Sequence, residues 1–216
     1  MELSIAANGA RSLAVIRGLA VGSRAALRSF RTARAPRISR DRAERLQHWY
    51  FGTGVSYYVS ARLAYFAQAV PVSGNLFHHA VEMLLKGYLC RTLDDRGRWR
   101  LKHNLRKTWR RFKDEVRDPS LSRFDETIRE VDGFEQLRYP EKLKSYAFQV
   151  QLTGPFSRPE GTHGRRTKTF TLAVNDVDEL IAMLFAKAGF DPKFYLTRLG
   201  PSARPALQRD NPTGIW

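Results

Sequence analysis

Long apolar runs are missing from this sequence of 216 residues, and no stretch reaches the roughly 18 apolar residues of a bilayer-spanning helix. Cysteine is almost absent as well, since Cys90 is the only one. A single cysteine excludes an internal disulfide and a zinc site built on Cys-x-x-Cys pairs. Because Cys90 lies in an apolar stretch, we expect its thiol to be buried. The lack of a disulfide fits a reducing, cytoplasmic compartment. The lack of long apolar runs predicts no membrane partner.

Several motifs with known chemistry are also missing. The sequence has no HExxH motif or His/Asp cluster to hold a metal, no phosphate-binding glycine loop, no nucleophile elbow and no paired-carboxylate signature. We therefore expect no metal and no cofactor.

Acidic residues are scarce relative to basic ones, so the formal net charge is +16. Such a charge favours nucleic acid, an acidic partner or an anionic surface, and arginine-rich proteomes also produce it without such a role. Residues 1–40 contain eight arginines and one acid, Glu2. This segment fits an organelle transit peptide, a basic disordered arm or a start codon assigned too early, and we exclude it from the predicted fold.

Apolar residues recur with a helical period from about Asp41. The first predicted helix covers residues 42–69 and ends before Pro71. Its inner face consists of Val55, Val59, Leu63 and Phe66. The second helix reaches Leu89 after a short turn, so the two helices should pack antiparallel. Its apolar surface is so wide that we place it at the centre of a bundle.

Two more helices complete this predicted bundle over residues 41–145. One begins at Leu105, with Trp109 and Phe112 inward, and the other runs from about Leu121 to Pro140. The intervening stretch "RGRWRLK" is expected to be a basic loop. The fold class is thus mainly α, a four-helix bundle.

A different pattern follows in residues 146–200. Apolar and polar residues alternate over 146–152 and again over 170–174, which predicts two strands that form a β-hairpin with a long loop. A final helix should begin with Asn175 as its cap and end at Gly189. Residues 201–216 contain three prolines, and we expect a flexible tail there.

A narrow polar stripe crosses the second helix. His79, Glu82 and Lys86 lie at positions i, i+3 and i+7, and Glu82 and Lys86 form a favourable i, i+4 pair. A histidine held by a carboxylate is typical of a general base. An internally satisfied polar seam between helices has the same pattern, and the residues favour that structural interpretation.

Three motifs follow one another in a characteristic order. They are AxExxLK at 80–86, His-Asn-Leu at 103–105 and Arg-Tyr-Pro at 138–140. With the stretch "YYVSARLAYF", they resemble the HEPN superfamily over about residues 50–142. Members of that superfamily are α-helical bundles in prokaryotic toxin–antitoxin, defence and stress systems, and some pair with minimal nucleotidyltransferases. The resemblance does not extend to the strands or the last helix.

Ribonucleases of that superfamily carry an Arg-x(4–6)-His motif. Two chains join their motifs in a metal-free site, where the arginine steadies the phosphate and the histidine assists the 2′-hydroxyl or the departing oxygen. Here four residues separate Arg98 from His103. Trp99, however, stands where those enzymes usually have a polar residue. The resemblance therefore implies a degenerate, non-catalytic domain, and an endoribonuclease using Arg98 and His103 is the alternative.

A basic stretch from 96 to 113 contains nine basic residues and no acid. The side chains expected to bind a phosphate backbone are Arg100, Lys102, Arg106, Lys107, Arg110 and Arg111. Trp99 could stack on an unpaired base or plug the end of the bundle. The alternative is a solvated helix face.

The sequence thus predicts a homodimeric protein that binds RNA or a nucleotide without catalysis of its own. Besides the endoribonuclease, a module that serves a nucleotidyltransferase partner is the other alternative. The substrate, the partner and the pathway are not encoded in any motif found here.

Overall fold

The computed structural model describes residues 39–139, 141, 145–154, 156 and 168–216. Residues 37–216 belong to one compact unit, and Met1–Pro36 is assigned to another. The predictions for residues 1–38 and for the tip of the loop between the strands lie outside the described residues. In the described part, the protein is mainly helical with a small two-stranded sheet, so the mainly α class is confirmed. No helix in these ranges has the length and apolarity needed to cross a bilayer.

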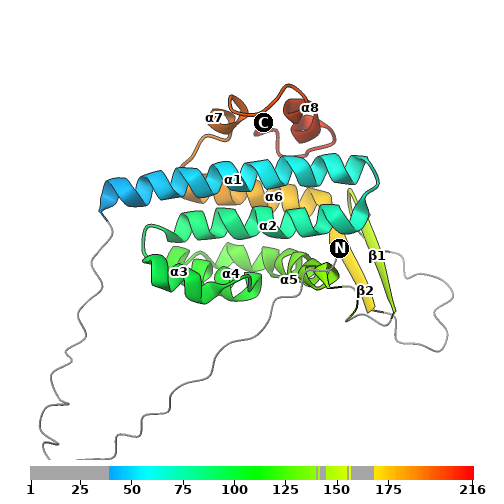
Figure 1. Ribbon diagram of the computed structural model, residues 1–216, viewed down its shortest axis with the longest axis horizontal. Coiled ribbons are helices and arrows are strands. Elements are labelled where there is room, and N and C mark those ends of the chain that lie inside the picture. The colour runs from blue at the N-terminus through cyan, green and yellow to red at the C-terminus, as the bar shows by residue number, and fades with distance from the viewer. Residues whose placement is uncertain (1–38, 140, 142–144, 155, 157–167) are drawn as a thin grey trace, which may run out of the picture. The chain divides into compact units, whose positions relative to one another are not determined.

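The first two helices form an antiparallel pair, as predicted. Helix α1 (Arg40–Phe66) begins where the Ser39 hydroxyl accepts a hydrogen bond from the Arg42 amide, and α2 (Val70–Leu89) follows after three residues. The two helices lie side by side along their length (Figure 1). Gly54 permits this approach, because a Cβ there would lie 2.9 Å from the Leu84 side chain.

Helix α2 is the centre of the structure, as predicted from its wide apolar surface. It contacts α1, α4 (Leu105–Val116), α5 (Asp125–Gly133) and α6 (Val174–Ala188). Its fully buried apolar side chains are Phe77, Ala80, Val81, Leu84, Leu85 and Leu89. Cys90 follows the helix and is buried as expected, and burial raises the pKa of its thiol to about 11.

The buried face of α1 differs from the predicted one. Val55 and Val59 are buried, but Leu63 is 43% exposed and its neighbour Arg62 is fully buried. The Arg62 guanidinium pairs with Asp178 of α6 and donates to two backbone carbonyls, those of Ala206 and Arg209. These partners satisfy a charge that would otherwise exclude Arg62 from the interior.

The region between α2 and α4 is partly helical, which corrects the expectation of a basic loop. Helix α3 (Asp95–Leu101) is capped by Asp94, whose side chain accepts a hydrogen bond from the Gly97 amide. Helix α4 buries Leu105, Trp109 and Phe112 as predicted. The fourth predicted helix is broken into three pieces: the 3₁₀ turn η1 (Pro119–Phe124), α5 and the 3₁₀ turn η2 (Phe134–Arg138).

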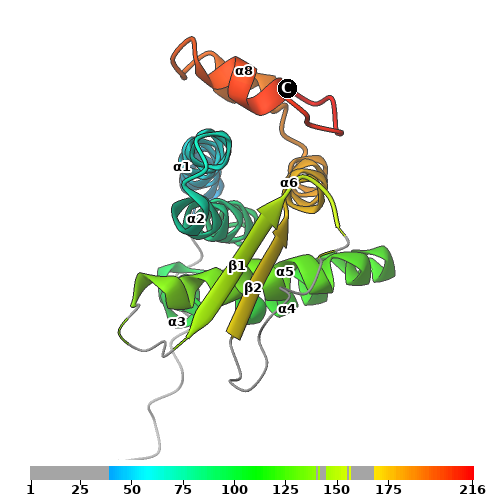
Figure 2. The ribbon, with the colours of Figure 1, turned by 90° about the vertical axis from the view of Figure 1, so that its right-hand side faces the viewer.

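The two strands are parallel, so the predicted β-hairpin is wrong. Strand β1 (Tyr146–Gln151) pairs with β2 (Lys168–Ala173) in a register that places Tyr146 opposite Lys168 and Gln151 opposite Ala173. Both strands run toward α6 (Figure 2). The connection over residues 152–167 is long enough to return to the starting end of β1, since a strand of six residues is only about 20 Å long.

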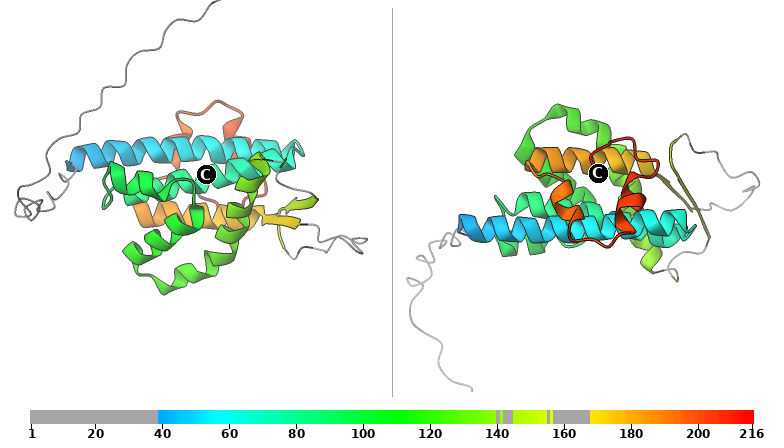
Figure 3. Two further views of the ribbon diagram at one scale, coloured as in Figure 1. Left: turned by 60° about the horizontal axis from the view of Figure 1, so that its bottom comes forward. Right: turned by 90° about the horizontal axis from the view of Figure 1, so that it is seen from above.

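The C-terminal third packs on the bundle. Helix α6 starts directly after β2, with Ala173 as its cap rather than the predicted Asn175, and it ends at Gly189, whose φ of 71° is left-handed. It packs against α2 and α5. Two short helices, α7 (Lys193–Leu196) and α8 (Ala203–Gln208), lie over α1 and α6 (Figure 3). Residues 201–216 thus contain a helix and the buried Trp216, in contrast to the flexible tail expected.

Replacement of Gly74 by alanine should destabilise the fold. A Cβ at Gly74 would lie 1.9 Å from Cδ1 of Phe134, a buried ring of η2. The cost of overpacking, about 1–3 kcal/mol, exceeds the roughly 1 kcal/mol that alanine contributes within a helix. Denaturant unfolding measures the change. Gly52→Ala is the control, since its Cβ would meet Tyr195 at an ordinary 3.8 Å. Equal stability of the two variants would contradict the prediction.

Candidate functional site: the Glu82 cluster and the basic face

The predicted polar stripe forms a buried cluster around Glu82. The Lys86 ammonium donates to Glu82 Oε1 at 2.6 Å, and His79 Nδ1 lies 3.5 Å from Glu82 Oε2. Glu82 is fully buried and Lys86 nearly so, whereas the His79 side chain is 20% exposed. The structure therefore brings all three residues together, with one edge toward the surface.

His103 joins this cluster from the start of α4. Its Nδ1 lies 3.2 Å from Oε1 and 3.3 Å from Oε2 of Glu82, while 63% of its side chain stays exposed. The turn that positions it also places the Lys102 carbonyl 2.6 Å from the Lys86 ammonium. Asn104 then caps α4 by accepting a hydrogen bond from the Lys107 amide. The carboxylate of α2 is thus connected to the start of α4.

Glu82 is held in its ionised form. Burial alone would raise the pKa of its carboxyl group. Hydrogen bonds from His79, Lys86 and His103, together with the positive charge of Lys86, more than offset burial and lower the pKa from 4.5 to about 2. At neutral pH the cluster therefore contains a buried carboxylate with a fixed negative charge.

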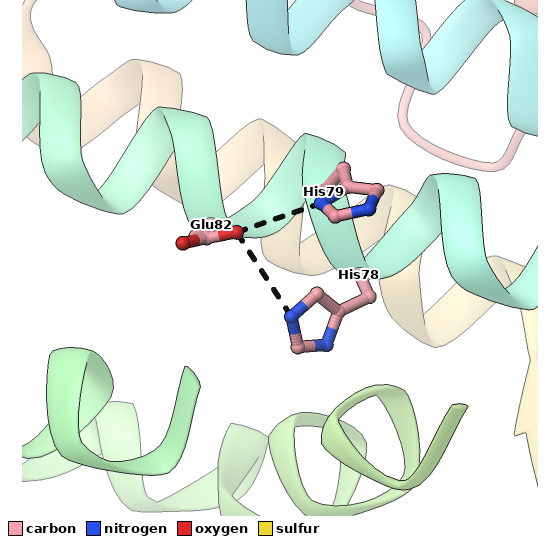
Figure 4. Close-up of side chains that lie close together, drawn as sticks. All are labelled: His78, His79 and Glu82. Atoms are coloured by element: carbon pink, nitrogen blue, oxygen red, sulfur yellow. Dashed lines mark ion pairs between the residues drawn. The ribbon is translucent and has the colours of Figure 1, made fainter. Parts of the chain in front are cut away.

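Two residues that sequence reasoning missed extend the cluster toward η2. His78 is fully buried on α2, and its Nε2 lies 4.0 Å from Glu82 Oε2 and 3.8 Å from Glu135 Oε2. His78 and His79 leave the helix in different directions, and both point toward Glu82 (Figure 4). The i, i+4 spacing of His78 and Glu82 could have been found in the sequence. The contact with Glu135 could not, because the two residues are far apart along the chain.

Arg98 lies in a different environment from His103. Its side chain is 5% exposed, its guanidinium donates to the Leu93 carbonyl and to Asp95, and it also hydrogen-bonds Tyr50. These bonds hold Arg98 against the turn before α3, against Asp95 of α3 itself and against Tyr50 of α1. No hydrogen bond or ion pair is seen between Arg98 and His103 in the described part of the chain.

The predicted phosphate-binding residues lie on α3, on α4 and in the turn between them, and they are here called the basic face. Its members are Arg100, Lys102, Arg106, Lys107, Arg110 and Arg111, all of them exposed. Arg111 pairs with Glu115, and Lys107 donates to the Arg100 carbonyl. In the described part of the chain, the other four have no carboxylate partner.

A groove of about 710 Å³ opens beside the basic face, between α4 and α5. Arg106 and Arg110 line it, and its acids are already engaged: Asp125 binds Lys113 and the Trp109 indole, and Glu126 binds Arg129. The Asp132 carboxylate instead accepts a hydrogen bond from the Leu105 amide. The four cations of the groove thus outnumber its three acids by one. Trp99, 74% exposed on α3, does not plug the bundle.

Comparison of this chain with protein-family models, with curated proteins and with solved structures finds no match. The chemistry of the two surfaces therefore has to be judged from their own residues.

Proposed function

We propose that this protein is a HEPN-like helical domain that binds RNA, or a nucleotide, through the basic face and the adjoining groove. The observation that supports the proposal best is the exposure of Arg100, Lys102, Arg106 and Arg110 without carboxylate partners in the described ranges, beside a groove in which Asp125 and Glu126 are paired with cations. Such a surface attracts phosphates and releases their counterions. The exposed indole of Trp99 adds a flat apolar surface on which an unpaired base can stack.

The HEPN-like part of the proposal rests on the motif order and on the contacts of the motif residues. Glu82 and Lys86 of the AxExxLK motif meet at the centre of the helical core, and His103 of the next motif contacts that same carboxylate. Residues that far apart in the sequence form one structural unit. In this proposal the protein acts in the cytoplasm of a prokaryote, as a homodimer, in a defence or stress system.

Binding without catalysis is preferred to the endoribonuclease alternative. Arg98 would have to leave Leu93, Asp95 and Tyr50 to reach a phosphate, and its burial argues against that movement. His103 is exposed, but an imidazole without an arginine partner lacks the group that steadies the phosphate. No observation favours the nucleotidyltransferase-partner alternative over RNA binding.

A salt titration of RNA binding tests the proposal. We expect a labelled single-stranded RNA to bind the wild-type protein with an affinity that falls steeply with salt. Arg106→Ala/Arg110→Ala should lower the slope of log affinity against log salt by about 1.4, because each phosphate contact to a single strand contributes about 0.7. That change corresponds to a roughly 25-fold loss of affinity at 0.1 M salt. Fluorescence anisotropy gives both quantities.

The matched control is Lys193→Ala/Arg204→Ala, which removes the same charge from exposed positions on α7 and α8. It should keep the wild-type slope. Absence of binding at low salt, or equal losses in both variants, would contradict the proposal. Intact RNA after incubation is also expected. Cleavage that disappears in His103→Ala would instead support the endoribonuclease.

A further inference from the structure

Two buried polar atoms near the Glu82 cluster have no hydrogen-bond partner. They are Nε2 of His78 and Oε2 of Glu135, which lie 3.8 Å apart. Buried polar atoms are nearly always satisfied by protein or by an ordered ligand. The gap between these two atoms is too wide for a direct hydrogen bond, so it has room for a bridging atom.

The ring of His78 has a defined tautomer. Its Nδ1–H donates to the Val131 carbonyl at 3.4 Å, which leaves the lone pair of the neutral ring on Nε2. Histidine ligands of metals typically donate their second nitrogen to a carbonyl in this way. The Nε2 lone pair then faces two carboxylate oxygens.

The second oxygen of each carboxylate is already occupied. Lys86 donates to Oε1 of Glu82 at 2.6 Å, and Arg138 donates to Oε1 of Glu135 at 2.9 Å. Both Oε2 atoms face His78, and that of Glu82 also lies 3.3 Å from His103 Nδ1. His79 Nδ1 approaches the same Glu82 Oε2 to 3.5 Å, and the ligand atoms of His78, His79 and Glu82 all lie within 4.8 Å of one another.

We propose that His78 Nε2, His79 Nδ1, Glu82 Oε2 and Glu135 Oε2 bind one divalent transition-metal ion of the Zn²⁺ class. Zn²⁺ takes tetrahedral sites with nitrogen and oxygen ligands at about 2.0–2.1 Å, which places neighbouring ligand atoms about 3.4 Å apart. The observed separations of 3.5, 3.8 and 4.0 Å are close to this value. His78, His79 and Glu82 already lie within 4.8 Å of one another, and the Glu135 side chain has to move toward His79 and Glu82 to complete the site.

The proposed site has the charge and the access that a metal needs. Two carboxylates face the ion and offset part of its charge, although Lys86 and Arg138 also pair with them, and the partly exposed side chains of His79 and Glu135 give a path from the surface. The ion connects α2 to η2, so its binding stabilises the fold by mass action. This inference is independent of RNA binding, and it replaces the sequence-based expectation that no metal binds.

Titration with ZnCl₂ against a chromophoric chelator tests the proposal on the tag-free, full-length chain. We expect one Zn²⁺ per chain, a higher unfolding temperature with Zn²⁺, and visible absorption bands of tetrahedral Co²⁺ when CoCl₂ replaces it. His78→Ala should weaken the affinity at least about tenfold. Glu135→Gln should also weaken it, and this variant removes only a partly exposed carboxylate, so it keeps the test valid if His78→Ala fails to fold.

The control is His48→Gln, because His48 lies against Tyr195 and Phe190, away from the cluster. It should retain wild-type affinity. Weak, non-stoichiometric uptake of Zn²⁺ would overturn the proposal and leave a bridging water as the occupant of the gap. Equal affinity of the wild type and both cluster variants would also overturn it.

Discussion

Replacement of Asp178 by asparagine should lower the free energy of unfolding by about 3–5 kcal/mol. The change keeps the size of the side chain but removes the charge that compensates the fully buried Arg62 guanidinium. A buried charge without its partner is one of the most destabilising defects in a protein interior. Tyr58 also donates its hydroxyl proton to Asp178, so the defect extends to a second buried side chain. Urea unfolding followed by circular dichroism measures the loss.

Arg129→Ala provides the comparison for that experiment. Arg129 pairs with Glu126, but both side chains are about 60% exposed, and such pairs contribute about 0–1 kcal/mol. Hydrogen exchange adds a second readout, because Arg62 also holds the carbonyls of Ala206 and Arg209. Asp178→Asn should therefore speed exchange in residues 203–211. A loss below about 1 kcal/mol, with unchanged exchange, would show that the pair is not buried in solution.

Replacement of Glu82 by glutamine should make the protein less sensitive to acid. The folded-state pKa of Glu82 is about 2, below its ordinary value of 4.5, so the carboxylate stabilises the folded state above pH 4.5. This contribution is lost as the pH falls from 4.5 through about 2. A shift of this size corresponds to roughly 3 kcal/mol. We expect the stability of Glu82→Gln to fall less than that of the wild type between pH 4.5 and pH 2. At neutral pH the variant should be less stable than the wild type.

Unfolding should be measured between pH 7 and pH 2 in the presence of a chelator, so that metal binding does not contribute. Glu44→Gln is the matched variant, since Glu44 is an exposed carboxylate of α1. It should follow the wild-type curve. If Glu82→Gln follows that curve as well, the hydrogen bonds from Lys86, His79 and His103 do not lower the pKa as the geometry implies.

The helical core could be predicted from the sequence because its signals are local. Helices α2 and α4 have apolar residues at regular helical spacing, and Trp109 and Phe112, which were predicted to point inward, are buried. The polar stripe was found for the same reason, since Glu82 and Lys86 are neighbours on one helix. Local spacing is enough to bring such residues together.

Strand direction and buried charge were not predictable in this way. The alternation around Phe148 and Leu172 predicts two strands but does not specify whether they run parallel, and the connection is long enough for either arrangement. Arg62 lies beside the predicted apolar face of α1, and its burial depends on Asp178, which is distant in the sequence. Helix α3 was missed because it is short and strongly charged.

Two residues of the candidate metal site were missed for the same reason, since their contact joins positions that are distant in the sequence. His78 follows Phe77 in a largely apolar helix, and only its i, i+4 spacing from Glu82 marked it in the sequence. Its role depends on Glu135, which η2 brings to it only in the folded chain. Arg98, by contrast, had the right spacing from His103 but is buried against Leu93 and Asp95. Spacing in the sequence does not decide which direction a side chain takes at the end of a helix.

The direct junction between β2 and α6 fixes the rotational phase of that helix. Ala173 is the last residue of β2 and Val174 is the first of α6, so no linker absorbs a change in length. Deletion of one residue within 168–173 would turn α6 by about 100° and carry Leu180 and Leu184 out of the interior. The pairing of two short strands therefore determines which side of α6 meets α2. An insertion or deletion at this junction is incompatible with the packing of α6 described above.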